Sequence, residues 1–137
     1  MDIAALLHGW SDVALLALRV SLGAVFLSHG MMKWGMWKMQ PSEQMSGGML
    51  NMLRFLSIME PLGGAAVIAG FLTQFAAAGF VLVMLGAIWF KIRAWKLPFI
   101  GVNATGWEFD LMNLSSSLVL ITAGAGMYSL DRWLFGL

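Results

Sequence analysis

The chain alternates between long apolar stretches and short polar connections. Each stretch is long enough to cross a hydrocarbon layer of about 30 Å as an α-helix. A β-barrel is the poorer interpretation, because membrane strands alternate apolar and polar residues and these stretches do not. Thr73 and Gln74 are expected to form a tight hairpin between the middle two stretches. The pattern therefore predicts an all-α polytopic membrane protein, a four-transmembrane-helix bundle with spans at residues 12–33, 50–73, 75–95 and 109–130.

Aromatic and basic residues gather where the predicted spans end. Tryptophan favours the membrane–water interface, and lysine and arginine favour the cytoplasmic side. We therefore expect both termini to be non-cytoplasmic and the protein to lie in the cell (inner) membrane. The residues that define this cationic end are Trp34, Trp37, Trp95, Trp107, Lys33, Lys38, Lys91, Arg93 and Lys96.

Composition narrows the possible function classes. Hydrophobic residues make up 60% of the chain and charged residues 11%, with a mean hydropathy of +0.81, which excludes an ordinary soluble domain. A net charge of +1 gives no basic field for nucleic acid. With no Cys and two His, no haem, flavin or metal ligand set is evident. Residues 1–137 are expected to form one domain with the lipid bilayer as its main partner.

Ionisable residues inside the spans are candidate functional groups. Arg19 and Lys33 share one helical face of the first span, with His29 at its border. Arg19 needs a polar partner in the membrane, and Glu60 is the obvious carboxylate, because helix rise places the two within roughly two turns. Such a pair could be functional, or it could only fix the helix register.

Several groups are expected to converge at the cationic end. His29, Lys33, Lys91, Glu108 and Trp107 come from different spans that all meet there. Such a group would suit a quinone. Aromatic side chains would pack on its ring, a cation or imidazole would donate to a carbonyl oxygen, and an acid would relay protons. The alternatives are an acid that only caps a helix and a histidine that only forms hydrogen bonds at the interface.

Methionines near the first connection offer a rival ligand. Thioether and imidazole groups suit Cu(I), although methionine is also a flexible filler of apolar packing. Seven of the twelve methionines lie there, at positions 31, 32, 36, 39, 45, 49 and 52.

A series of motif residues runs across nearly the whole chain: Arg19, Gly23, Phe26, His29, Gly30, Lys33, Glu60, Pro61, Gly63, Gly64, Gly70, Thr73, Met84, Ala87, Gly106, Glu108, Ser129, Leu130 and Asp131. Together these residues resemble the DoxX family. The resemblance implies a small four-helix membrane protein, related to the membrane subunit of thiosulfate:quinone oxidoreductase and to membrane partners of soluble redox enzymes. Two positions depart from the family pattern, with Lys91 in place of a histidine and Gln74 in place of a basic residue.

We therefore expect a membrane subunit of an oxidoreductase system that binds a quinone or similar lipophilic ligand and docks an electron-donating protein. The alternatives are a structural or assembly subunit of a larger membrane complex and a small transporter, and a homo-oligomer would also fit. The candidate catalytic residues are His29, Glu60 and Glu108, and the candidate binding residues are Arg19, Lys33, Lys91 and Trp107.

Overall fold

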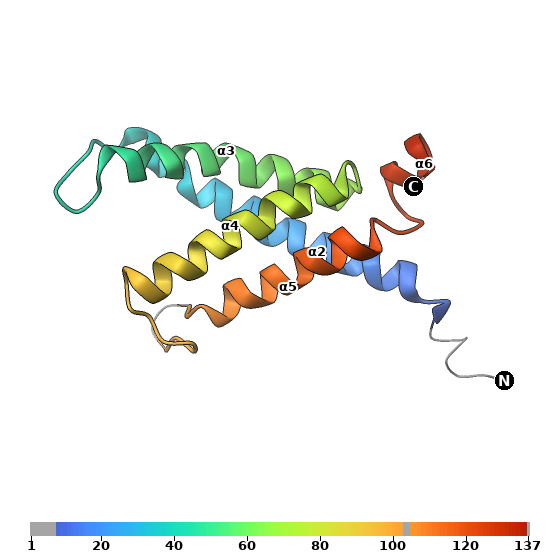
Figure 1. Cartoon of the computed structure of the whole chain (residues 1–137). Helices are drawn as coiled ribbons and strands as arrows, with labels where there is room; N and C mark the ends of the chain where they lie inside the picture. Colours follow the sequence, from blue (N-terminus) through green and yellow to red (C-terminus); the bar gives the residue numbers. More distant parts are fainter. Residues whose placement is uncertain (1–7, 103–104, 137) are drawn as a thin grey trace.

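The computed structural model describes residues 8–102 and 105–136, and the described residues form helices joined by short connections (Figure 1). Their only β-type pairing is one isolated bridge, between Ser42 and Met45. The predicted all-α class is therefore confirmed. The helices are α2 (Ser11–Met32), a 3-10 helix η1 (Lys33–Lys38), α3 (Gly47–Ala69), α4 (Thr73–Arg93), α5 (Glu108–Ala123) and α6 (Leu130–Phe135).

Three helical segments are long and apolar enough to cross a membrane. The first is α2 continued by η1, the second is α3 and the third is α4. They match the first three predicted spans to within a few residues. The fourth differs, because α5 has 16 residues and a length of about 24 Å. It ends where Gly124 and Gly126 each adopt a φ of 77°, a left-handed conformation that favours glycine and stops a helix.

The predicted hairpin between the second and third spans is also placed differently. The connection is formed by residues 70–72, and Thr73 and Gln74 are the first residues of α4. Gly70 ends α3 with a φ of 70°, and Leu72 has a φ of 47°. Both left-handed residues reverse the chain sooner than the apolar pattern indicated.

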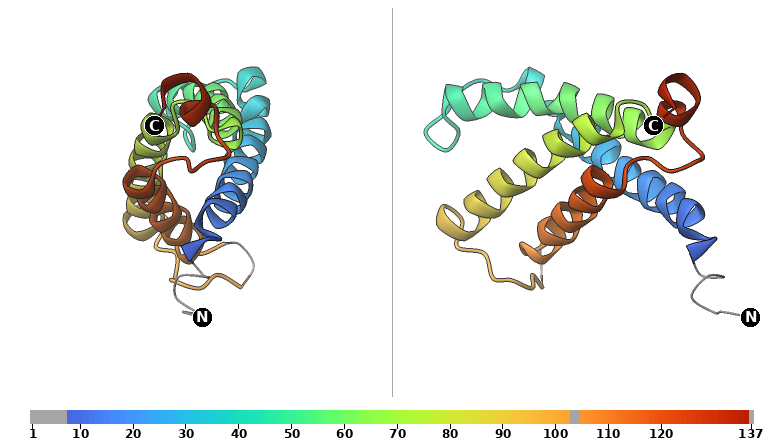
Figure 2. Two further views of the ribbon diagram at one scale, coloured as in Figure 1. Left: turned by 90° about the vertical axis from the view of Figure 1, so that its right-hand side faces the viewer. Right: turned by 45° about the vertical axis from the view of Figure 1, so that its right-hand side comes forward.

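The helices pack as two antiparallel pairs, α2 with α3 and α4 with α5 (Figures 1 and 2). A buried apolar cluster joins the pairs. At its centre the rings of Phe26 and Phe80 are stacked with centroids 3.5 Å apart. All four long helices contribute to the cluster, with Leu22, Phe26, Val67, Ala77, Phe80, Met84 and Leu120.

Glycines allow α2 and α3 to approach closely. A Cβ atom on Gly23 would lie 2.6 Å from the Gly64 carbonyl oxygen, and one on Gly64 would lie 2.6 Å from the Gly23 carbonyl oxygen. Gly30 packs in the same way against Pro61, which lies inside α3. Small residues at helix crossings are typical of membrane bundles.

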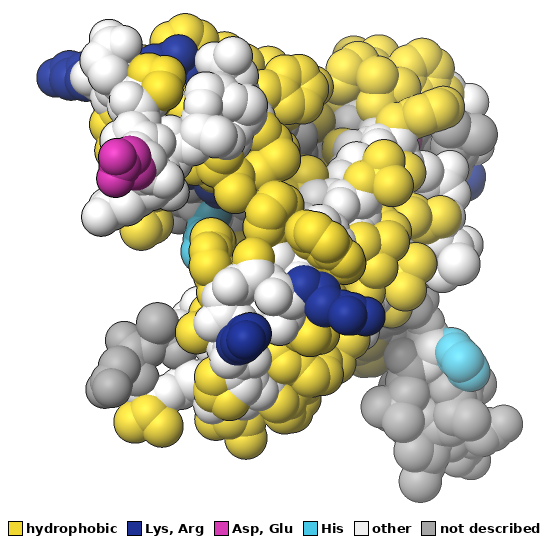
Figure 3. All heavy atoms as spheres, turned by 60° about the vertical axis from the view of Figure 1, so that its left-hand side comes forward, with side chains coloured by type: hydrophobic (Ala, Val, Ile, Leu, Met, Phe, Trp, Pro, Cys, Tyr) yellow, Lys and Arg dark blue, Asp and Glu magenta, His cyan; other side chains and the backbone are white. Residues whose placement is uncertain are grey.

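The outer faces of the bundle are strongly apolar, as Figure 3 shows for the side that carries the ends of α2 and α4. Such a surface in water would favour aggregation, whereas lipid would cover it. The large side chains that are more than 60% exposed include Phe55, Leu62, Phe75, Leu82 and Met112.

Candidate functional site

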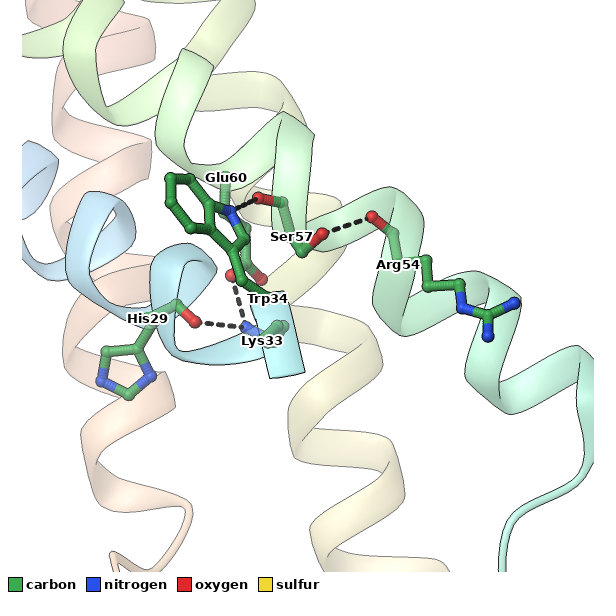
Figure 4. A network of polar contacts seen from close by, with 6 residues as sticks. All are labelled: His29, Lys33, Trp34, Arg54, Ser57 and Glu60. Carbon is green, nitrogen blue, oxygen red and sulfur yellow. Dashed lines mark hydrogen bonds and ion pairs between the residues drawn. The ribbon is translucent and has the colours of Figure 1, made fainter. Parts of the chain in front are cut away.

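The end of α2 and the middle of α3 are joined by an ion pair between Lys33 and Glu60 (Figure 4). The side chain of Glu60 is 4% exposed and that of Lys33 is 24% exposed. Lys33 also donates to the His29 carbonyl oxygen, one helical turn earlier, at 3.3 Å. The carboxylate therefore lies within the α2–α3 interface, whereas the lysine is partly exposed.

Arg19 is not the partner of Glu60, so the predicted pairing is wrong. Its guanidinium is 1% exposed and donates to three backbone carbonyl oxygens, of Val67 at 3.1 Å, Ile68 at 3.0 Å and Ala125 at 2.6 Å. Arg19 lies 14 residues before Lys33, or about 21 Å along α2. It therefore belongs to the opposite end of the bundle, where carbonyl oxygens at and beyond the helix ends accept its hydrogen bonds.

A second ion pair joins α4 to α5. The Lys91 ammonium lies 2.7 Å from an oxygen of Asp110, and both side chains are at least 87% buried. Lys91 also donates to the Gly106 carbonyl oxygen at 3.0 Å. The sequence analysis named Lys91 as a candidate binding residue but did not identify Asp110 as its partner. The only indication of Asp110 in the sequence is its position in the first turn of α5, two residues after Glu108.

Glu108 begins α5 beside the connection from α4. Its backbone N–H donates to the Phe99 carbonyl oxygen at 3.1 Å, and one carboxylate oxygen accepts from the Gly101 N–H at 3.5 Å. The other oxygen is buried and finds no hydrogen-bond partner in the part of the chain that the structure describes. Next to it, Trp107 packs edge-on against Phe99 with centroids 4.5 Å apart.

His29 lies between the Lys33–Glu60 ion pair and the residues at the start of α5. Its ring is exposed, points away from Glu60 (Figure 4) and packs on Phe109 with ring centroids 5.5 Å apart. The first turn of α5 is therefore adjacent to the last turn of α2. The contact runs through Phe109, and no hydrogen bond between His29 and Glu108 is present among the described residues.

A polar network that sequence reasoning missed holds η1 on α3. Ser57 is fully buried and its hydroxyl accepts from the Trp37 indole at 2.9 Å, while its carbonyl oxygen accepts from the Trp34 indole at 3.0 Å. Arg54 donates to the Met36 carbonyl oxygen at 3.1 Å. These contacts fix the chain that follows Lys33, so two tryptophans predicted as interfacial anchors also position the ion pair. Figure 4 shows one of them, Trp34, beside Ser57.

Two cavities of the described structure lie away from these groups. One of about 510 Å³ opens at the opposite end of the bundle, beside Asp12 and Arg132. The other, of about 100 Å³, lies between α2 and α5 and is lined in part by Ser21 and Asn113.

Comparisons with known proteins place the chain in a family. Residues 14–92 match the DoxX family. A Bacillus subtilis protein named "Putative oxidoreductase CatD" is 32% identical over 127 residues, which cover 90% of this chain and 89% of that protein. An uncharacterized membrane protein of Mycobacterium tuberculosis is 31% identical over 143 aligned residues, covering 93% and 85% of the two chains. No solved structure matches. The chain is therefore an integral membrane protein that belongs to the DoxX family.

Proposed function

We propose that this protein is the membrane subunit of an oxidoreductase system, binding a quinone head group at its cationic end and docking an electron-donating protein there. The observation that carries the proposal is the arrangement at the end of α2, where the exposed His29 ring lies one helical turn before Lys33, and Lys33 pairs with the buried Glu60. The similarity to a Bacillus subtilis protein named as an oxidoreductase supports it.

The chemistry suits these groups. Reduction of a quinone to a quinol takes two electrons and two protons, and the carbonyl oxygens accept the protons. His29 would donate a hydrogen bond to one oxygen while the ring lies near Phe109. Lys33 keeps donor capacity because its side chain is 24% exposed. The Lys33–Glu60 pair would pass one proton to the second quinone oxygen and take up a replacement proton from water. The docked protein would supply both electrons.

The electron donor would dock on the water-facing part of the same end. Lys38, Arg93 and Lys96 are exposed there, so the surface favours an acidic partner. By the excess of basic residues this end would be cytoplasmic, in the inner membrane, with both termini outside.

This topology needs α5 as a fourth span. Gln74 at the start of α4 donates to the Ile121 carbonyl oxygen near the end of α5 at 2.7 Å, and Lys91 near the end of α4 pairs with Asp110 near the start of α5. The two helices therefore run antiparallel over most of the length of α5. We therefore expect α5 to cross the membrane in the direction opposite to α4. A helix that is a few ångströms shorter than the hydrocarbon layer costs little, because the bilayer can thin around it.

Titration of the purified protein with a soluble quinone analogue tests the proposal. His29→Ala should weaken binding by about 0.5–3 kcal/mol, the range for one hydrogen bond. His8→Ala is the matched control, because His8 is the only other histidine and is exposed on the residues before α2. Lys33→Met should weaken binding further.

Failure of the unmodified protein to bind any quinone would refute the proposal. Equal binding by the His29 and His8 variants would remove His29 from the site. If the protein instead copurifies in fixed stoichiometry with a large complex and binds no quinone, the structural-subunit alternative gains support.

A further inference from the structure

A cavity lies at the end of the bundle opposite the proposed quinone site. Its volume of about 510 Å³ lies within the range of small-molecule sites. It is bounded by the start of α2, the start of α4, the end of α5 and α6, so four segments distant in sequence form it. The residues that line it include Asp12, Gln74, Met127, Asp131 and Arg132.

Of the two acids in this cavity, Asp131 is committed to holding the fold. Its two oxygens accept the backbone N–H groups of Leu72 at 2.6 Å and Thr73 at 2.9 Å, and thus cap the start of α4. Its side chain is buried. Asp131 therefore has little capacity to meet a ligand.

Asp12 and Arg132 are the charged groups that remain for a ligand. One oxygen of Asp12 accepts the Met127 N–H at 2.7 Å, and within the described residues its second oxygen has no hydrogen bond. Arg132 is exposed and donates only to the Gly136 carbonyl oxygen, at 3.3 Å, among those same residues. The carbonyl end of α5 adds negative potential near Asp12. The cavity therefore offers one anionic and one cationic group.

The surroundings favour a lipid head group with a primary amine. Met127, Tyr128 and Trp133, on and beside α6, are 61%, 54% and 79% exposed, which suits the interface where head groups meet acyl chains. No aromatic residue lines the cavity in the described structure. Quaternary ammonium groups are typically held by aromatic cages, so an ammonium that donates hydrogen bonds fits better than choline.

We propose that this cavity binds a phosphoethanolamine group, with the ammonium on Asp12 and the phosphate on Arg132. The group would come from phosphatidylethanolamine, whose acyl chains would lie along the exposed apolar side chains beside α6. This site is independent of the proposed quinone site, because none of its residues belongs to the cationic end.

Native mass spectrometry of the full chain in detergent tests the proposal. The protein is titrated with phosphatidylethanolamine, phosphatidylglycerol or phosphatidylcholine of identical acyl chains, and bound lipid is counted. We expect preferential retention of phosphatidylethanolamine. Asp12→Asn keeps an oxygen for the Met127 N–H but loses the charge, and should lower phosphatidylethanolamine binding about tenfold or more without affecting phosphatidylglycerol.

Two further variants complete the design. Arg132→Gln should weaken both phosphatidylethanolamine and phosphatidylglycerol, because both carry the phosphate. Glu43→Gln, at an exposed acid of the opposite end, should change neither. Equal retention of the three lipids by the unmodified protein would overturn the proposal, and so would unchanged binding in both the Asp12 and Arg132 variants.

Soluble phosphoethanolamine identifies the source of the group. If it displaces the bound lipid at millimolar concentration, the head group alone carries the affinity and a free phosphoethanolamine compound is an equally good ligand. If it does not while the Asp12 effect holds, the acyl chains contribute and the ligand is the lipid.

Discussion

The close contact between α2 and α3 predicts opposite effects for glycine substitutions at two kinds of position. A Cβ atom on Gly64 would lie 2.6 Å from the Gly23 carbonyl oxygen and 2.9 Å from the Leu27 backbone nitrogen. Both neighbours are backbone atoms, so the clash is relieved only if the helices separate. Gly79 and Gly86 lie inside α4 with no atom within 4 Å of an added Cβ.

The magnitude follows from two competing terms. Overpacking a helix interface costs about 1–3 kcal/mol, whereas replacing a mid-helix glycine with alanine gains about 0.5–1 kcal/mol. Gly64→Ala should therefore lower the free energy of unfolding by about 1–2 kcal/mol. Gly79→Ala and Gly86→Ala should leave it unchanged or raise it by up to about 1 kcal/mol.

Unfolding in mixed detergent micelles, followed by the loss of helical circular dichroism, measures these differences. Gly23→Ala should behave like Gly64→Ala, because it faces the same contact from the other helix. If Gly64→Ala and Gly79→Ala shift the transition equally and in the same direction, the close approach of α2 and α3 is not a stabilising feature and the reasoning fails.

Three other outcomes are expected. Glu60→Gln leaves Lys33 without an anion and should destabilise the protein by about 1–3 kcal/mol. Glu43→Gln changes an exposed acid and should have no effect, so equal melting temperatures of the two variants would contradict a stabilising ion pair. Phe26→Ala removes the central stacked ring and should lower the free energy of unfolding by about 3–5 kcal/mol. Phe55→Ala changes an exposed ring and should lower it little, so similar losses in the two variants would show that Phe26 is not at the centre of the core. The thiol introduced by Ser42→Cys should not react with a membrane-impermeant reagent added to intact cells. Labelling of this thiol from outside would contradict the proposed topology.

Hydropathy was sufficient to predict the first three long helices, because their composition differs sharply from that of their connections. It could not predict where α5 ends. The apolar sequence continues past Ala123, and the helix stops only because Gly124 and Gly126 adopt left-handed conformations. Glycine within a membrane stretch is equally compatible with helix packing, so the pattern alone does not distinguish the two uses.

The partners of the buried charges were harder to predict for a different reason. Arg19 is satisfied by backbone carbonyl oxygens, and every residue carries such a group, so no side chain in the sequence marks them. The pairing of Lys91 with Asp110 depends on the register between α4 and α5, which helical spacing within one span does not specify. Lys33 and Glu60 were each identified as candidates, but their pairing required the crossing of α2 and α3.

The placement of these charges separates the molecule into two functionally different ends. At one end Arg19 ties the end of α3 to the residues after α5, and Asp131 ties α6 to the start of α4. Both side chains are buried, so exchanging their hydrogen bonds for a ligand would leave donors and acceptors unpaired at a cost of about 1–3 kcal/mol each. At the cationic end Lys33 and His29 remain partly or fully exposed, so a ligand can meet them without breaking the fold. The proposed proton exchange with a quinone would therefore meet accessible groups at the cationic end, whereas the buried charges of the opposite end hold the helices in register.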